Sequence, residues 1–321
     1  MMSLTKLMLL LCLAIAPCVA LAAFPEKPVK LVVPFPPGGG SDSLARILAR
    51  KLQDIWGQPV VIENKGGAQG NIGTAYGVKQ PPDGYTVTLV VQGSLAISPH
   101  MYGKDVGFEV PKDFVAVVRG TEQSYVMVSR LGLPVKDLND LVRLAKEQPG
   151  KLTIGTSASG PQLVGELFKT STGTNLLHVP YKGGGPASMA ILAGEVDVLI
   201  SNPAGVVQQI KGKKVNPIAV LGTERNELIP EVSTAKEQNF PKLADIPEWY
   251  GFVVPAGTPQ AIVNKLNADF ITALKDPEVQ KSIRSNGATP SPSTPEAFSN
   301  QIMKDYERWG AMVKAAGLKP E

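Results

Sequence analysis

The chain has 321 residues, of which 43% are hydrophobic, and its formal net charge at pH 7 is only +4. This basic excess is too small and too dispersed to form a nucleic-acid-binding surface, so we expect no nucleic-acid partner. The two cysteines, Cys12 and Cys18, lie near the start of the chain, which excludes thiol chemistry in the remainder. The length suggests two domains and is sufficient to bury a substantial core without disulfides.

Residues 1–23 are typical of a secretory signal peptide. Lys6 supplies the positive segment, residues 7–16 form a short apolar core, and small residues follow it. We therefore expect a soluble, exported protein that is cleaved near Ala22 or Ala23.

Short apolar runs then alternate with helical patterns, separated by glycine-rich loops. The expected strands are Val29–Val33, 60–63 and 85–91, and the expected helices are 43–55 and 71–79. This order predicts an open, wound α/β sheet, in which ligands bind beyond the C-terminal ends of the strands. Gln92 and Ser94 follow the third strand and should line that edge.

The loop after the first strand is the leading candidate for an anion site. Pro37, Gly38, Gly39, Gly40 and Ser41 lead directly from a strand into a helix. Glycines allow backbone N–H groups to approach a ligand, and the helix dipole favours negative charge at this end. The alternative interpretation is an ordinary capped turn, and the loop alone does not distinguish the two.

A second domain is expected to begin near residue 125. Strands are predicted at 114–118, 125–129, 152–155, Leu177–Pro180, 196–200 and Val215–Leu221, and helices at 138–146, 162–170 and 187–192. The chain should return to the first domain near residues 247–251. Helices are then predicted at Gln260–Lys275, 278–285 and 295–316.

The loop before the helix at 162–170 is a second candidate for binding a carboxylate. It contains Thr156, Ser157, Ala158, Ser159 and Gly160, whose hydroxyl and N–H groups are suited to an anion. The alternative is simple capping of that helix by Ser159.

The residues give little support to other chemistries. A serine hydrolase using Ser157 or Ser159 would need a base, and the histidines are His100 and His178, the latter within an apolar strand. No cluster has metal-ligand spacing, and residues 67–73 have Gly-x-x-Gly-x-x-Gly rather than a dinucleotide pattern. We therefore expect no metal, no cofactor and no enzymatic activity.

Five motifs in this order resemble the Bug (TctC-like) family of periplasmic solute receptors, which serve tripartite tricarboxylate-type transporters. They are Pro-Pro-Gly-Gly-Gly-Ser-Asp at 36–42, Glu-Asn-Lys-Gly-Gly-Ala-Gln-Gly-Asn-Ile-Gly at 63–73, Pro-Asp-Gly-Tyr-Thr at 82–86, His-Val-Pro-Tyr-Lys-Gly-Gly-Gly-Pro-Ala at 178–187, and Pro-Ala-Gly-Thr-Pro at 255–259. Each motif alone is weak, but their order is specific and covers nearly the whole mature chain.

The resemblance implies an α/β, two-lobed periplasmic binding protein (a Venus flytrap, type II-like), in which each lobe is an open wound sheet with flanking helices. One lobe would comprise 24–124 and 248–321, and the other 125–247. The family implies a monomer that captures a small carboxylate and delivers it to a membrane permease.

By resemblance, the loops at 37–42 and 156–161 would hold the carboxylate, with Tyr181, Ser201 and Asn202 as further contacts. Asp42 is expected to cap its helix, because its charge would repel the ligand. Relatives often carry an acid at the position of Ser201, so its neutral hydroxyl favours a dicarboxylate or an aromatic carboxylate over an acidic amino acid. A secreted serine hydrolase and a ligand-sensing subunit for a membrane kinase remain alternatives.

Overall fold

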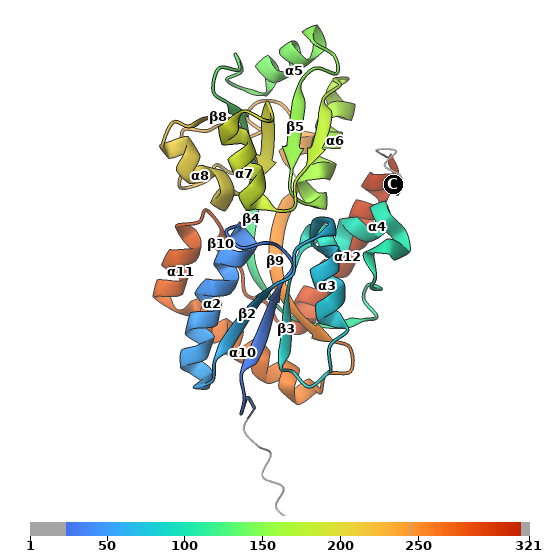
Figure 1. Cartoon of the computed structure of the whole chain (residues 1–321), viewed down its shortest axis with the longest axis vertical. Coiled ribbons are helices and arrows are strands. Elements are labelled where there is room, and N and C mark those ends of the chain that lie inside the picture. Colours follow the sequence, from blue (N-terminus) through green and yellow to red (C-terminus); the bar gives the residue numbers. More distant parts are fainter. Residues whose placement is uncertain (1–23, 245, 316–321) are drawn as a thin grey trace, which may run out of the picture.

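The computed structural model describes residues 24–244 and 246–315, so the predicted signal peptide lies outside the described residues. Two lobes are stacked along the longest axis of the molecule, and strands β4 (Phe114–Arg130) and β9 (Pro247–Pro255) run between them (Figure 1). No helix within the described ranges is long and apolar enough to cross a membrane.

The lower lobe of Figure 1 is built from the two ends of the described chain. Its first part contains β1 (Val29–Val33), α2 (Gly40–Trp56), β2 (Val60–Asn64), η1 (Ala68–Gly70), α3 (Asn71–Val78), β3 (Thr86–Val91), the π-helix η2 (Gly93–Ile97), α4 (Ser98–Tyr102) and η3 (Gly103–Val106). Its last part contains α10 (Gln260–Lys275), α11 (Pro277–Arg284), β10 (Thr289–Pro290) and α12 (Pro295–Ala315).

The upper lobe comes from the middle of the chain (Figure 1). It contains α5 (Leu138–Glu147), β5 (Thr153–Thr156), α6 (Ser159–Thr172), β6 (Leu177–Pro180), α7 (Gly184–Ala193), β7 (Val198–Ser201), α8 (Pro203–Lys211), β8 (Val215–Leu221) and α9 (Pro241–Ala244).

The strands of the two lobes form one continuous mixed sheet with the order β2-β1-β3-β9-β4-β7-β5-β6, and β8 and β10 also pair with β4. Strands β1, β2 and β3 are parallel, as are β5, β6 and β7, whereas β4 and β9 are antiparallel to their neighbours. The prediction of an open α/β sheet in each lobe is confirmed in outline.

Strand β4 corrects one prediction, because the segments expected at 114–118 and 125–129 are a single strand of 17 residues. Its residues 114–124 pair with β9, and its residues 125–130 pair with β7 and β8. Gly120 and polar Thr121 and Gln123 interrupt the apolar pattern, which made the sequence look like two strands. The extended backbone continues through them because β9 supplies hydrogen-bond partners.

The apolar side chains that the periodicity indicated are buried. The amphipathic stripe of α2 packs Leu44, Leu48 and Leu52 against β1 and β3, in a cluster that also contains Phe252 and Phe270. On α12, Phe298, Ile302, Trp309 and Val313 recur at helical spacing and are buried as well, and each such side chain contributes about 1.5–3 kcal/mol.

The core clusters also extend from one lobe to the other. Trp309 and Val313 of α12, with Ile97 and Met101, belong to the same cluster as the upper-lobe residues Leu163 and Phe168 and others around them. The lobes therefore touch through buried apolar surface.

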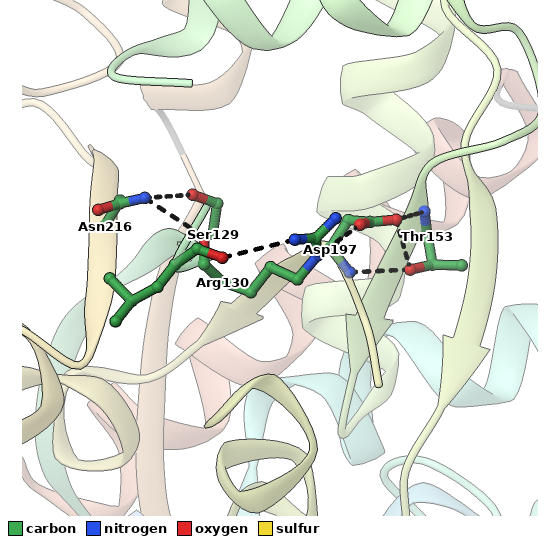
Figure 2. Close-up of polar contacts among 6 residues, drawn as sticks. Ser129, Arg130, Thr153, Asp197 and Asn216 are labelled. Carbon is green, nitrogen blue, oxygen red and sulfur yellow. Dashed lines mark hydrogen bonds and ion pairs between the residues drawn. The ribbon is translucent and has the colours of Figure 1, made fainter. Parts of the chain in front are cut away.

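A polar network holds the upper-lobe strands together at the end remote from β9 (Figure 2). The carboxylate of Asp197 accepts hydrogen bonds from Arg130 Nε at 2.8 Å, Thr153 N at 2.9 Å and Thr153 Oγ1 at 3.0 Å. Asn216 donates to Ser129 Oγ at 3.4 Å and to the carbonyl of Arg130 at 3.3 Å. These bonds tie β4, β5, β7 and β8 together through side chains.

We expect Asp197→Ala to lower the free energy of unfolding by about 2–3 kcal/mol, because it leaves a partly buried guanidinium and an N–H group without their acceptor. Urea denaturation measures the change. Asp140→Ala, which removes the partner of the exposed Arg143 and an acceptor for a backbone N–H, is the control and should cost about 1 kcal/mol or less. Equal losses of unfolding free energy in the two variants would show that the Asp197 network does not stabilise the sheet more than an exposed ion pair does.

Candidate functional site

A narrow cavity lies where the two lobes meet, and four helices begin around it. Its lining includes residues of the first turns of α2, α6 and α7 and the N-cap of α8. The lining residues are Phe35, Gly39, Gly40, Ser41, Val91, Ser157, Ala158, Pro161, Gly184, Asn202, Glu248 and Tyr250. Four helix N-termini direct partial positive charge and unpaired N–H groups at this space, so the cavity is suited to an anion.

The glycine loop of the lower lobe forms one wall. Helix α2 begins at Gly40, and Ser41 lies in its first turn. Its N-cap is Gly39, which has an extended backbone and no side-chain capping bond. A Cβ on Gly39 would lie 3.8 Å from the backbone nitrogen of Gly184, and one on Gly40 would lie 3.0 Å from Asn202 Oδ1. The loop therefore lies directly against the upper lobe, and Pro37 and Gly38 lie just outside the cavity lining.

Asp42 supports this loop and does not line the cavity. Its carboxylate accepts hydrogen bonds from Gly38 N at 3.0 Å, Arg46 Nε at 2.9 Å and Asn64 Nδ2 at 2.9 Å. Burial alone would raise the pKa of Asp42, but these hydrogen bonds and the charge of Arg46 bring it below its ordinary value. The expected capping bond is not formed, because the Asp42 carboxylate accepts instead from Gly38, the residue before the N-cap.

The loop at 156–160 forms the facing wall, but only part of it reaches the cavity. Ser157 and Ala158 line the space, whereas Thr156 Oγ1 bonds to His178 Nε2 at 2.7 Å. Gly160 lies against the Tyr125 hydroxyl, which a Cβ at this position would meet at 2.1 Å. A glycine is therefore required at position 160, because the Tyr125 side chain of β4 leaves no room for a Cβ.

Ser159 connects the lobes instead of capping its helix. The N-cap of α6 is Ala158, so the capping interpretation of Ser159 is wrong. The Ser159 hydroxyl bonds to Ser98 Oγ at 2.6 Å and to Gln69 Oε1 at 2.9 Å, and Gln69 also donates to Gln162 Oε1 at 2.9 Å. These bonds hold the two lobes together beside the cavity.

The other predicted site residues are dispersed. Asn202 caps α8 by accepting from Gly205 N at 3.2 Å, and it donates to the Tyr250 hydroxyl at 3.0 Å, so it lies at the cavity and bridges the lobes. Ser201 is buried beneath α8, and its Oγ has no hydrogen-bond partner among the described residues. Tyr181 packs half-buried against the upper-lobe core, outside the lining.

Gln92 and Ser94 also do not reach the cavity. Gln92 Nε2 donates to Asp305 at 3.3 Å, and Ser94 Oγ donates to the carbonyl of Val91 at 2.9 Å, and both side chains are fully buried. The chain turns from β3 directly into the π-helix η2, which directs these side chains inward. Val91, the last residue of the strand, lines the cavity instead.

Glu248 is a charged residue of the cavity lining to which the sequence patterns gave no role in the site. Its side chain is 4% exposed, and its Oε2 accepts from Gln123 Nε2, its paired residue on β4. Burial raises the pKa of Glu248 to about 7, although the hydrogen bond from Gln123 and the hydroxyls of Tyr125 and Tyr250 act to lower it. A charged residue in the strongly apolar segment from Pro247 to Pro255 was the signal for this position.

A larger hollow of about 1240 Å³ borders the same strands, with Glu122, Glu224, Arg225 and Arg284 among its lining residues. It is lined by charges of both signs. We assign function to the narrower cavity because the helix N-termini converge there.

No group of three or more potential metal ligands occurs in the part of the chain that the structure describes.

The fold and the cleft define a two-lobed periplasmic binding protein, as the sequence predicted. Residues 44–318 match the tripartite tricarboxylate transporter family receptor, TctC, and the chain belongs to this family. The family consists of solute receptors, so the chain is a receptor and not an enzyme, and the hydrolase alternative is wrong.

Several relatives resemble the chain over almost its whole length. Protein BugT of Bordetella pertussis is 35% identical, with 95% of this chain and 94% of BugT covered. The periplasmic binding protein BugD is 31% identical in sequence. Its solved structure matches this one with a TM-score of 0.88, over 93% of this chain and 100% of that chain. The R. palustris protein Rpa4515, solved with adipate, is 32% identical with a TM-score of 0.89, over 93% of this chain and 100% of that one.

The pKa of Glu248 predicts a specific dependence of stability on pH. The folded-state pKa of Glu248, about 7, lies above its ordinary value of 4.5. The stability that protonated Glu248 contributes to the folded state is therefore fully present below about pH 4.5 and is lost as the pH rises through 7. The wild type should therefore lose on the order of 2–3 kcal/mol more than Glu248→Gln between pH 5 and pH 8. Urea denaturation of the ligand-free proteins at each pH measures this difference.

The control for this prediction is Glu122→Gln, which changes the acid next to Gln123 on β4, where the side chain is 43% exposed. That variant should keep the pH profile of the wild type. Parallel profiles for the wild type and Glu248→Gln would contradict the assignment of a raised pKa to Glu248.

Proposed function

We propose that the protein captures a small carboxylate between its lobes in the periplasm and delivers it to the membrane permease of a tripartite tricarboxylate-type transporter. The observation that supports this proposal most strongly is the convergence of the N-termini of α2, α6, α7 and α8 on one cavity. No Lys or Arg among the described residues lines this cavity, so backbone N–H groups and helix dipoles would have to hold the anion.

Under this proposal, Gly39, Gly40 and Ser41 hold one side of the carboxylate, and Ser157 and Ala158 hold the other. Asn202 supports closure through its bond to Tyr250. The lobes would be 24–124 with 248–321, and 125–247. The protein would act as a monomer after removal of residues 1–23.

Two solved relatives favour a dicarboxylate. Rpa4515 was solved with adipate, and MatC of Rhodopseudomonas palustris, which is 29% identical with a TM-score of 0.86 over 90% of this chain, was solved with malate. The neutral hydroxyl of Ser201 does not contribute to this preference, because Ser201 is buried and lies outside the cavity lining.

We expect one or more carboxylates in a panel of malate, adipate, succinate, benzoate and glutamate to stabilise the protein. Ligand at about 100 times its Kd adds about 2.7 kcal/mol to the free energy of unfolding, which a thermal-shift screen detects and calorimetry quantifies. Dicarboxylates should bind more tightly than glutamate. If no member of a broad set of carboxylates changes the melting temperature, the proposed function is wrong.

We expect Gly39→Leu to weaken binding of the best ligand at least tenfold, or about 1.4 kcal/mol, because its side chain would fill the gap between the glycine loop and Gly184. Gly39 has φ −90° and ψ 174°, which any residue adopts, so the substitution adds a side chain without straining the backbone. Gly39→Ala, whose Cβ would make only ordinary contact, should have a smaller effect. An unchanged Kd in Gly39→Leu would place the ligand elsewhere.

A further inference from the structure

Glu248 lies at the point where the sheet passes from one lobe to the other. It is the Cα partner of Gln123, and the next residue pair, Ser124 with Pro247, ends the pairing of β4 with β9. From Tyr125 onward, β4 pairs only with upper-lobe strands. The Glu248 carboxyl is therefore at the base of the cleft, between the two lobes.

The surroundings of Glu248 contain no cation to balance its charge. Glu248 is the only acidic or basic side chain that lines the cavity in the described part of the chain. The polar groups that face it from the elements around the cavity are Gln123 and Tyr125 of β4, Tyr250 of β9, Ser41 of α2, Ser157 before α6, and Asn202 at the start of α8. None of these side chains carries charge at neutral pH, because burial and the neighbouring Glu248 raise the pKa values of both tyrosines well above 10.

A captured carboxylate would thus share a small, poorly hydrated space with the Glu248 carboxyl. Two carboxylates at close range cannot both stay ionised at low cost, so the first charge raises the pKa of the second group. Gln123 Nε2 donates to Glu248 Oε2, and the hydroxyls of Tyr125 and Tyr250 lie beside the carboxyl, so Oε1 is the oxygen that can carry a proton without loss of the Gln123 bond. A proton on that oxygen converts the repulsion into a charge-assisted hydrogen bond.

We propose that Glu248 is a specificity-determining contact: in its protonated form it donates a hydrogen bond to the bound carboxylate, so that capture of the anion takes up a proton from solvent. This inference rests on the proposed function. The helix N-termini hold one carboxylate end of the ligand, and Glu248 holds an anionic oxygen on the β9 side of the cavity. A ligand that presents an ammonium group at that point gains nothing from the protonated acid, which favours dicarboxylates over acidic amino acids.

The test is calorimetry with malate and adipate, and with the tightest ligand from the panel, between pH 6.5 and 8.5. Each titration is repeated in two buffers with different ionisation enthalpies, which reveals the number of protons taken up. For the wild type, we expect uptake approaching one proton per ligand at the upper end of the range, and a Kd that rises up to about tenfold per pH unit above the pKa of Glu248.

Glu248→Gln keeps the shape and a hydrogen-bond donor but cannot titrate. We expect this variant to bind with a Kd that is independent of pH, without proton uptake, and at least tenfold more tightly than the wild type at pH 8.5. Glu122→Gln is the matched control, because it removes one carboxylate from the neighbouring position on β4 outside the cavity. The Glu122→Gln variant should keep the wild-type dependence of Kd on pH and the wild-type proton uptake.

The outcomes separate the two proposals. A wild type that binds a carboxylate with a flat pH profile and no proton uptake overturns the role of Glu248 and leaves the proposed function standing. Affinity that increases with pH also overturns it, because the ionised acid would then be the binding form. A wild type that binds no carboxylate at any pH overturns both. The proton count on the wild type is sufficient even if Glu248→Gln does not fold.

Discussion

The pairing of β4 with β9 is the constraint on which the rest of the molecule depends. One strand of 17 residues belongs to both lobes, and its first part is held by β9 up to the pair Ser124 and Pro247. Because the same strand then continues between β7 and β8 and pairs with both, the two lobes are joined to one another through hydrogen-bonded backbone. The cavity lies beside this junction, so the shape of the site and the joining of the lobes depend on the same few residues.

Opposing electrostatic effects meet at this junction. Four helix N-termini make the cavity favourable for negative charge, while burial at its base makes the charge of Glu248 unfavourable. A receptor with a lysine or arginine in its cleft would bind an anion more strongly but would also release it less readily. Backbone dipoles provide a weaker, distributed attraction that comes from both lobes, so under the proposed function anion binding would favour the arrangement in which the lobes meet.

The sequence placed the glycine loop and the facing loop at the C-terminal ends of parallel strands, and residues of both loops line one cavity. Gly39, Gly40, Ser41, Ser157, Ala158 and Asn202 line that cavity. The direction of the side chains could not be predicted in the same way. Ser159 bonds to Ser98, which is 61 residues away, and Ser94 turns back onto its own strand, so tertiary contacts and an unexpected π-helix decided their positions.

The sequence by itself determined the family, the alternation of strands and helices, and the two glycine- and hydroxyl-rich loops, because periodicity, turn residues and helix-start chemistry are local properties. The choice of which acid faces the ligand space was decided only by the tertiary structure. Asp42 follows the glycine loop in sequence, yet Arg46, Asn64 and Gly38 hold it away from the cavity. Glu248 is more than 200 residues from that loop and enters the cavity because β9 pairs with β4 at the crossing between the lobes. A pairing between strands so distant in the chain has no local signal, and the environment of a buried charge depends on every element packed around it.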